Sequence, residues 1–294
     1  MERPMIASRK LGSPVKDGIA FFKESGYLSL TVGGAVFAAI VVTAAAARLL
    51  FPGDPTDMVT TPLLWPGQSG LFPLGTTSLG QDVAAGLVWG ARASLQVGIL
   101  AAAVGLLLGL VAGTLAGYCG GWIDAVLVRV IALFQTMPPF LLVVVIVAID
   151  EPTLRTISLA IGLAGWPTVA RLVRAQVRSL RQAEFVLAAR CQGYGTTRIV
   201  LGEILPNALP PVIATVSVLV ANAILMEAGL SFLDMGDPNI VSWGSMIGAA
   251  RDTLRIDWYL AVLPGLAIAL TVLSLNLVSD GLTEVLSPRR RAAP

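Results

Sequence analysis

The stretch ASLQVGILAAAVGLLLGLVAGTLAG, residues 93–117, decides the class of fold to which this chain belongs. It lies within an uncharged run from Ala93 to Ile123, which Asp124 follows. About 20 apolar residues, each rising about 1.5 Å along a helix, cross a hydrocarbon core of about 30 Å, so the run predicts a membrane-spanning helix. Its glycines at 105, 109, 113 and 117 share one helix face and should let a neighbouring helix approach closely.

The composition extends this conclusion to the whole chain. Hydrophobic residues make up 55% of the 294 residues and charged residues 13%, whereas soluble domains carry roughly 25% charged residues. The mean hydropathy is +0.80. Five further apolar runs predict five more spans, at Tyr27–Ala47, Val130–Ile149, Thr156–Ala170, Ile204–Met226 and Trp258–Ser279. We therefore predict an all-α membrane protein with six transmembrane helices.

The lysines and arginines indicate how the chain is oriented. If the N-terminus lies in the cytoplasm, most of the 20 positive side chains fall on the cytoplasmic side, and those left outside are Arg48, Arg92, Arg155, Arg251 and Arg255. Under the positive-inside rule this bias predicts that both termini are cytoplasmic. Topology thus explains the basic side chains, including Arg289 to Arg291, and we expect the lipid bilayer rather than nucleic acid as their surroundings.

What the sequence lacks excludes several kinds of chemistry. It contains no histidine, which excludes His-based metal sites, Ser-His-Asp triads and histidine proton relays. Its lysines, at 10, 16 and 23, do not follow the spacing of a phosphate-binding loop, so the chain is not expected to hydrolyse ATP itself. We predict no catalytic residue, no metal site and no cofactor bound by this chain. Carboxylates near the spans are limited to Glu227 and Asp280, at span ends.

A polar segment, EFVLAARCQGYGTTRIVLGEILPN at residues 184–207, lies between the fourth and fifth spans. Residues 184–192 predict a short helix that Gly193 ends in the left-handed conformation. A second helical stretch should begin at Arg198 and stop at Pro206, with Asn207 capping the fifth span. The result would be a short helix across the cytoplasmic ends of the bundle, with the small residues Ala188 and Ala189 allowing another surface to approach.

This segment carries a resemblance to a known family. Ala188, Ala189 and Gly193, followed by Ile204 to Asn207, resemble the EAA loop of the permease subunits of bacterial ATP-binding-cassette (ABC) importers, although Leu187 stands where many members have glutamate. The likeness to the dipeptide, oligopeptide and nickel branch extends from Leu74 to Arg289. It includes Gly90-Ala91-Arg92, Gly120-Gly121-Trp122, Val173-Arg174-Ala175-Gln176, Leu230 to Leu233, Ser242-Trp243-Gly244 and Asp280-Gly281-Leu282.

The resemblance implies the fold and the partners of the chain. It implies the type I ABC importer transmembrane fold, in a multi-pass protein of the bacterial cytoplasmic membrane. The expected partners are a second homologous permease subunit, two ATPase subunits that bind ATP and Mg, and an extracytoplasmic substrate-binding protein. The branch implies peptides as the leading substrate, with nickel chelates, glutathione and haem-like ligands as alternatives. An ion-coupled secondary carrier or channel is the alternative, although the sequence shows no clear inverted repeat.

The apolar runs, the positive-inside rule and the resemblance together divide the chain into regions. These are a cytoplasmic tail at 1–26, a first transmembrane helix at 27–50, an extracytoplasmic segment at 51–92, a five-helix permease core at 93–282 with a cytoplasmic coupling loop at 177–206, and a cytoplasmic tail at 283–294. Contact with the ATPase subunits is assigned to the coupling loop, namely Glu184, Ala188, Ala189, Gly193, Ile204, Leu205 and Pro206.

Residues of the pathway or outer gate are expected in two other segments. Residues 230–258 form a polar segment that suits a loop folding partly back into the bundle, and Thr136 to Pro139 should kink the third span through lost backbone hydrogen bonds. A plain connector and a packing kink are the respective alternatives. The candidate pathway or gate residues are Gln135, Met137, Glu227, Phe232, Asp234 and Trp243.

Overall fold

Long helices dominate the computed structural model, which describes residues 14–286, with side chains from Tyr27 onward. Within that range the β structure is limited to one isolated bridge, between Thr76 and Asp82. The long helices are α1 (Pro14–Ala45), α3 (Val83–Cys119), α6 (Leu154–Leu180), α9 (Leu205–Phe232) and α11 (Tyr259–Leu286). The shorter elements are α2 (Ala47–Leu50), α4 (Gly121–Thr136), α5 (Pro139–Ile149), α7 (Glu184–Cys191), α8 (Thr196–Arg198), the π-helical η1 (Ile199–Ile204), α10 (Trp243–Ala249) and the 3-10 helix η2 (Arg251–Thr253).

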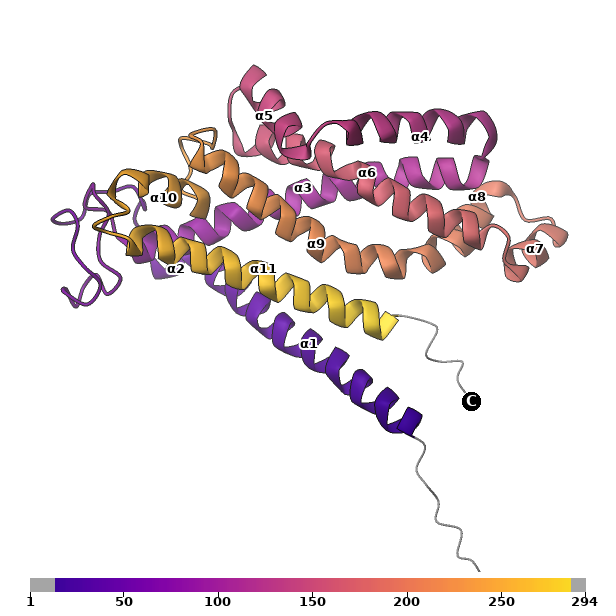
Figure 1. Ribbon diagram of the computed structural model, residues 1–294, viewed down its shortest axis with the longest axis horizontal. Helices are drawn as coiled ribbons and strands as arrows, with labels where there is room; N and C mark the ends of the chain where they lie inside the picture. Colours follow the sequence, from indigo (N-terminus) through magenta and orange to yellow (C-terminus); the bar gives the residue numbers. More distant parts are fainter. Residues whose placement is uncertain (1–13, 287–294) are drawn as a thin grey trace, which may run out of the picture.

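Five helices in the described range are long and apolar enough to cross a membrane, and the count rises to six if the bent pair α4–α5 forms one span. This agrees with the predicted all-α fold. α3, α6 and α9 run along the length of the molecule, while α1 and α11 pack together and diverge from them toward their free ends (Figure 1). The predicted tails fall partly outside the described residues, which include neither 1–13 nor Arg289 to Arg291.

The tightest seam of the bundle joins α3 to α6 and is built on glycine. A Cβ on Gly113 would lie 2.6 Å from the Ala170 carbonyl oxygen, and one on Gly117 would lie 2.8 Å from that of Arg174. In the other direction, a Cβ on Gly162 of α6 would lie 2.7 Å from the Cβ of Val104. The predicted close approach to the four-residue glycine repeat is therefore confirmed, and its partner is α6.

The third predicted span is broken rather than kinked. α4 and α5 meet at an angle of 84° across the break at Met137 and Pro138. Met137 is extended (φ −92°, ψ 136°), because the ring of a following proline disfavours the helical conformation and Pro138 and Pro139 have no N–H to donate. The disruption lies where the sequence predicted it, but it is larger, and α4 already begins at Gly121.

The segment after α7 corrects one prediction. The helix does not stop at Pro206: α8, η1 and α9 follow one another without a break, and the wide π-helical turn of η1 ends two residues before the proline. Such a turn moves the preceding carbonyl groups away from the ring, which removes the usual reason for a stop. Asn207 is not an N-cap either, since its side-chain amide donates to the Glu203 carbonyl at 2.6 Å.

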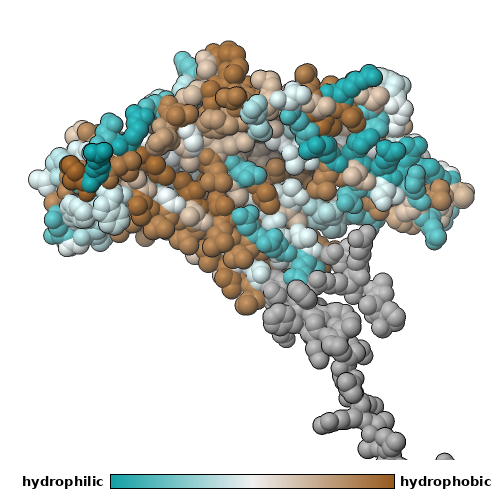
Figure 2. Space-filling model, viewed as in Figure 1, coloured by the Kyte–Doolittle hydropathy of each residue, from teal (hydrophilic) through white to brown (hydrophobic). Residues whose placement is uncertain are grey.

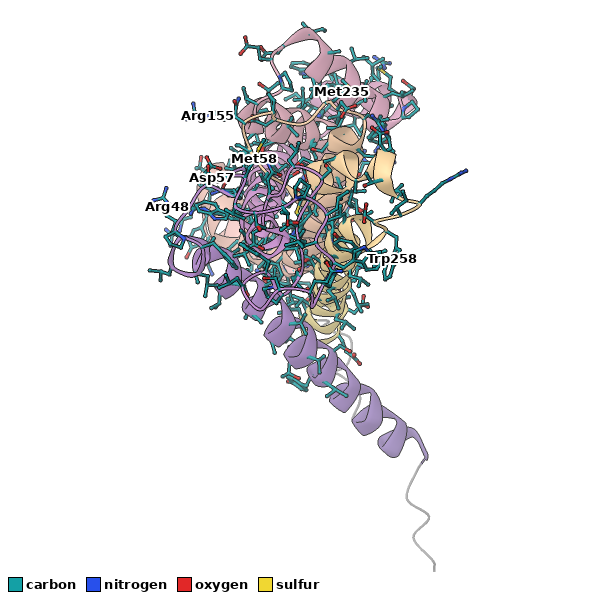
Figure 3. The ribbon with its side chains drawn as sticks, turned by 90° about the vertical axis from the view of Figure 1, so that its left-hand side faces the viewer. Arg48, Asp57, Met58, Arg155, Met235 and Trp258 are labelled. Atoms are coloured by element: carbon teal, nitrogen blue, oxygen red, sulfur yellow. The ribbon has the colours of Figure 1, made fainter. Side chains whose placement is uncertain are left out.

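One end of the molecule is formed by the loop 51–82 together with α10. α3 begins at Val83, with Asp82 as N-cap, so the last part of segment 51–92 is helical. The Tyr259 hydroxyl lies 2.9 Å from the Leu64 carbonyl oxygen and thereby ties the loop to the start of α11. Trp65 packs edge-on against Trp258, with ring centroids 6.5 Å apart. Figure 3 looks onto this end, where Arg48, Asp57, Met58, Arg155, Met235 and Trp258 are labelled.

Candidate functional site

The two ends of the bundle hold the residues that the sequence singled out. α7 and α8 lie at one end and α10 at the other (Figure 1). On the face shown in Figure 2, hydrophilic residues gather at the end that carries α7, and apolar residues cover much of the body between the ends. We call these ends the α7 end and the α10 end.

α7 is seated on the bundle by two side chains. Val186 and Ala189 are buried and belong to an apolar cluster that includes Ile199, Ile204 and Val177. Because these two residues are three positions apart, they form one stripe along the helix. Gly193, at φ +77°, ends the turn after α7 as predicted, and the following Tyr194 N–H donates to the Ala189 carbonyl at 3.1 Å.

The opposite face of α7 is exposed. It comprises an outer stripe at spacings of three, one and three residues: Glu184, Leu187, Ala188 and Cys191. Leu187 is 48% exposed, and its neighbour Phe185 is 40% exposed, although both are large apolar side chains. Of the two alanines, only Ala188 is presented outward, since Ala189 is buried. The expectation that both alanines meet a partner surface is therefore wrong for Ala189, whose face already packs against η1.

The remaining residues of the predicted coupling loop divide in the same way. Ile204 is fully buried in the apolar cluster under α7, Leu205 is half-buried, and Pro206 is exposed. Ile204 and Ala189 thus hold α7 in place, while Glu184, Ala188 and Pro206 stay accessible. Sequence reasoning missed Phe185 and Leu187. They stand one position on either side of the buried Val186, so they project to its two flanks, where both are exposed.

An ion pair links α4 to α6 near the α7 end. Arg174 donates hydrogen bonds to Asp124 from two nitrogens, and its Nη2 lies 2.8 Å from Oδ2. This fork-to-carboxylate geometry is the stronger kind of ion pair, because both hydrogen bonds are charge-assisted. It fixes the start of α4 against α6, the helix that leads directly into α7.

At the α10 end, Glu227 joins three elements. Only 3% of it is exposed, and its carboxylate accepts hydrogen bonds from Ser242 at 2.6 Å, Ser231 at 2.8 Å and Ser94 at 3.3 Å. These serines belong to the N-cap of α10, to α9 and to α3. Glu227 therefore holds α10 against α9 and α3, because its hydrogen-bond partners are serine hydroxyls from these three elements.

The other candidates at the α10 end contribute differently. Trp243 is buried, its indole N–H donates to the Leu87 carbonyl at 2.9 Å, and its backbone N–H donates to Ser94 at 3.3 Å, which connects it to Glu227. Phe232 and Asp234 lie on the surface, and the Asp234 carboxylate lies 3.3 Å from an Arg251 nitrogen. The segment 230–258 does fold back on the bundle, since α10 packs against α9, α11 and α3.

The break between α4 and α5 exposes Gln135 and Met137. Close to the break, a cavity of about 180 Å³ opens beside Pro139, and it is lined mainly by α3, α6 and α9. Its polar lining comes from Thr168, Thr215 and Asn222, of which Thr168 and Asn222 are exposed in this chain. Sequence reasoning missed these residues. Thr215 and Asn222 stand seven positions apart in a mostly apolar span, and that spacing places them on one face.

Within the described residues, no group of three or more His, Cys, Asp and Glu side chains could hold a metal ion. The candidate site comprises three places: the outer stripe of α7, the α10 junction at Glu227 and the polar cavity beside the helix break.

Comparison with known proteins relates this arrangement to a family. Residues 105–292 match the model of the family "Binding-protein-dependent transport system inner membrane component". A di/tripeptide transport system permease protein DppC of Pseudomonas aeruginosa is 35% identical over 288 residues, covering 96% of this chain and 94% of that protein. A glutathione transport system permease protein GsiD of Pectobacterium atrosepticum is 31% identical, covering 98% and 96% of the two chains.

A solved structure supports the same fold. A chain of the methionine ABC transporter MetNI in an inward-facing conformation superposes with a TM-score of 0.55 at 18% identity. The match covers 68% of this chain and 96% of that one. At this identity the likeness concerns the fold alone.

Proposed function

The chain belongs to the family of binding-protein-dependent transport system inner membrane components, and from this premise we propose that it forms half of the translocation pathway of an ATP-driven peptide importer. It is a multi-pass permease subunit of an ABC importer in the bacterial cytoplasmic membrane. The names of its relatives favour di- and tripeptides or a similar small solute such as glutathione as the cargo.

The observation that carries the proposal is the two-sided character of α7. Its inner stripe is buried against η1 and α9, while its outer stripe offers Leu187 and Ala188, with Phe185 beside them, to whatever lies beyond. A short helix held firmly on one side, with apolar side chains exposed on the other, suits a groove in a partner protein. We assign that groove to separate ATPase subunits, which bind ATP and Mg and hydrolyse ATP.

The remaining partners follow from the same mechanism. A second, homologous permease subunit would supply the other half of the pathway, and an extracytoplasmic binding protein would deliver the cargo at the α10 end. Movement of the ATPase subunits would reach the spans through α7 as a rigid-body displacement. The half-pathway of this chain would include the exposed break at Gln135 and Met137 and the polar cavity at Asn222. Glu227 serves this pathway indirectly, by holding α10.

The test is uptake by proteoliposomes that contain the complete complex. Wild type should accumulate a labelled dipeptide only when ATP and the binding protein are present. Leu187→Lys should reduce ATP-dependent uptake at least about tenfold while the chain still folds, because it places a positive charge in the proposed apolar contact. Thr197→Lys, at an exposed position outside the outer stripe of α7, is the matched control and should transport normally.

The same assay separates the alternative of an ion-coupled carrier. A carrier would accumulate the peptide with this chain alone, and an ionophore would abolish the accumulation. Either that behaviour or full activity of Leu187→Lys would overturn the proposal.

A further inference from the structure

A second cavity lies beside α7 and shares one residue, Leu187, with the outer stripe. It has a volume of about 510 Å³ and is formed where the turn between α3 and α4 meets the end of α6 and the side of α7 that carries Leu187 and Arg190. Its lining includes three arginines, Arg178, Arg181 and Arg190. A volume in this range suits a small ligand or a lipid headgroup.

Two of these arginines share one aromatic platform. The guanidinium carbon of Arg181 lies 5.6 Å from the centre of the Tyr118 ring, and that of Arg190 lies 6.0 Å from it. Gly120 belongs to the same wall, and a Cβ there would lie 3.3 Å from an Arg181 nitrogen. The ring therefore brings the positive charge of α7 and that of the end of α6 to one place, at the turn that follows α3.

The positive charge of the cavity is not balanced by the protein. The acidic residue in the lining is Asp124, and both of its oxygens are already engaged by Arg174. In the described part of the chain, no ion pair is formed by Arg178, Arg181 or Arg190. Guanidinium groups gathered in a hollow repel one another, and an anion that accepts hydrogen bonds from several of them relieves the repulsion.

We propose that this cavity, which we call the arginine cavity, binds a phosphate group, carried by an anionic lipid headgroup or by free phosphate. The tetrahedral oxygens of phosphate suit several guanidinium forks at once. α4 begins at Gly121 in the same wall, so its first backbone N–H groups add to the attraction for an anion. α3 and α6 are long and apolar enough to cross a membrane, and the arginine cavity lies at their ends, the level at which lipid headgroups lie.

Binding there would act on α7. Arg190 and Leu187 belong to α7, whereas Arg178 and Arg181 come from the end of α6 and its cap, so a bound phosphate would bridge the two elements. α7 is otherwise held by Val186 and Ala189. A bound phosphate is therefore expected to hold α7 more rigidly against the bundle. Phosphate binding in the arginine cavity does not depend on the transport function proposed above.

The experiment measures binding to the full-length chain purified in a neutral detergent. Short-chain phosphatidylglycerol, short-chain phosphatidylcholine and inorganic phosphate are titrated separately by calorimetry at low and high salt. Binding of phosphatidylglycerol alone identifies a lipid headgroup as the ligand, and binding of inorganic phosphate as well identifies the phosphate group itself. In both cases affinity should fall as salt is raised.

Variants locate the binding. The double variant Arg181→Gln with Arg190→Gln should lower the affinity at least about tenfold, because two charge-assisted contacts are lost. Tyr118→Leu keeps every charge and should lower the affinity about threefold by loosening the platform. Arg171→Gln, on the same face of α6 but outside the arginine cavity, should bind like wild type.

Two results would overturn the inference: wild type binds none of the three probes, or the double variant and Tyr118→Leu both bind as tightly as wild type. Suppose that no probe binds and that the double variant also loses the ATPase subunits on co-purification. The guanidinium groups would then serve a carboxylate of the partner protein. If wild type binds phosphate but the complete complex does not take up peptide, that result would count against the proposed function and not against the arginine cavity.

Discussion

α10 and α7 are both short helices, of seven and eight residues, yet they are attached to the bundle in opposite ways. α10 begins with a complete capping box at Ser242, buries Trp243 and is fastened through Ser242 to Glu227. α7 has no side-chain cap and buries only Val186 and Ala189. A helix locked from inside by polar and apolar contacts is part of the scaffold, whereas one that leaves most of its side chains exposed is available to a partner.

The largest expected effect on the contrast between α10 and α7 comes from removing the Glu227 carboxylate, which holds α10 in place. Glu227→Ala leaves three buried or partly buried serine hydroxyls without their acceptor, and we expect it to lower the free energy of unfolding by about 3 kcal/mol. Thermal unfolding in detergent measures this effect. Glu227→Gln keeps an amide oxygen as acceptor and should lose clearly less. If the two variants were equally stable, the hydroxyl network would not be what anchors α10.

The next prediction compares two neighbouring residues of α7. Ala189→Trp forces a large ring into the packed cluster of Val186 and Ile204 and should cost about 2 kcal/mol of unfolding free energy. Ala188→Trp points outward and should change that quantity by less than about 0.5 kcal/mol. Its effect should appear in ATP-dependent uptake instead. Equal destabilisation by both substitutions would show that α7 has no outward face.

The smallest expected effect concerns the surface of the α10 end. Arg251 and Asp234 form an ion pair at 3.3 Å, but their side chains are 47% and 73% exposed. Water and salt screen such a pair, so Arg251→Ala should change the free energy of unfolding by at most about 0.5 kcal/mol. The same thermal unfolding assay applies. A loss as large as that of Glu227→Ala would move the anchor of α10 from the buried carboxylate to the surface.

Structural features that depend on the local conformational or membrane preference of a few residues were predicted well. The apolar runs located the long helices, the glycine repeat of α3 indicated a close neighbour, and Pro138 and Pro139 located the break. Gly193 ended α7 as expected. Each of these signals acts within a few residues of its own position, through hydrocarbon transfer, the missing N–H of proline or the conformational freedom of glycine.

The candidate site was predicted only in part. The sequence located α7 but assigned Ala189 to the wrong face, because the burial of one face depends on η1, which folds against it. It suggested a pathway role for Glu227, whereas the structure surrounds this carboxylate with serines from positions 94, 231 and 242. The prediction that the helix ends at Pro206 was wrong for a similar reason, since the π-helical turn before the proline accommodates its ring.

The sequence by itself determined that this chain lives in a membrane, where its helices lie and to which family it is related, because apolar length and motif order are properties of the chain alone. The tertiary structure decided which side chains of α7 face outward, which serines meet Glu227 and how Tyr118 gathers two distant arginines. These facts join residues far apart in sequence, and their distances are set by the packing of α3, α6 and α9, which no local pattern encodes.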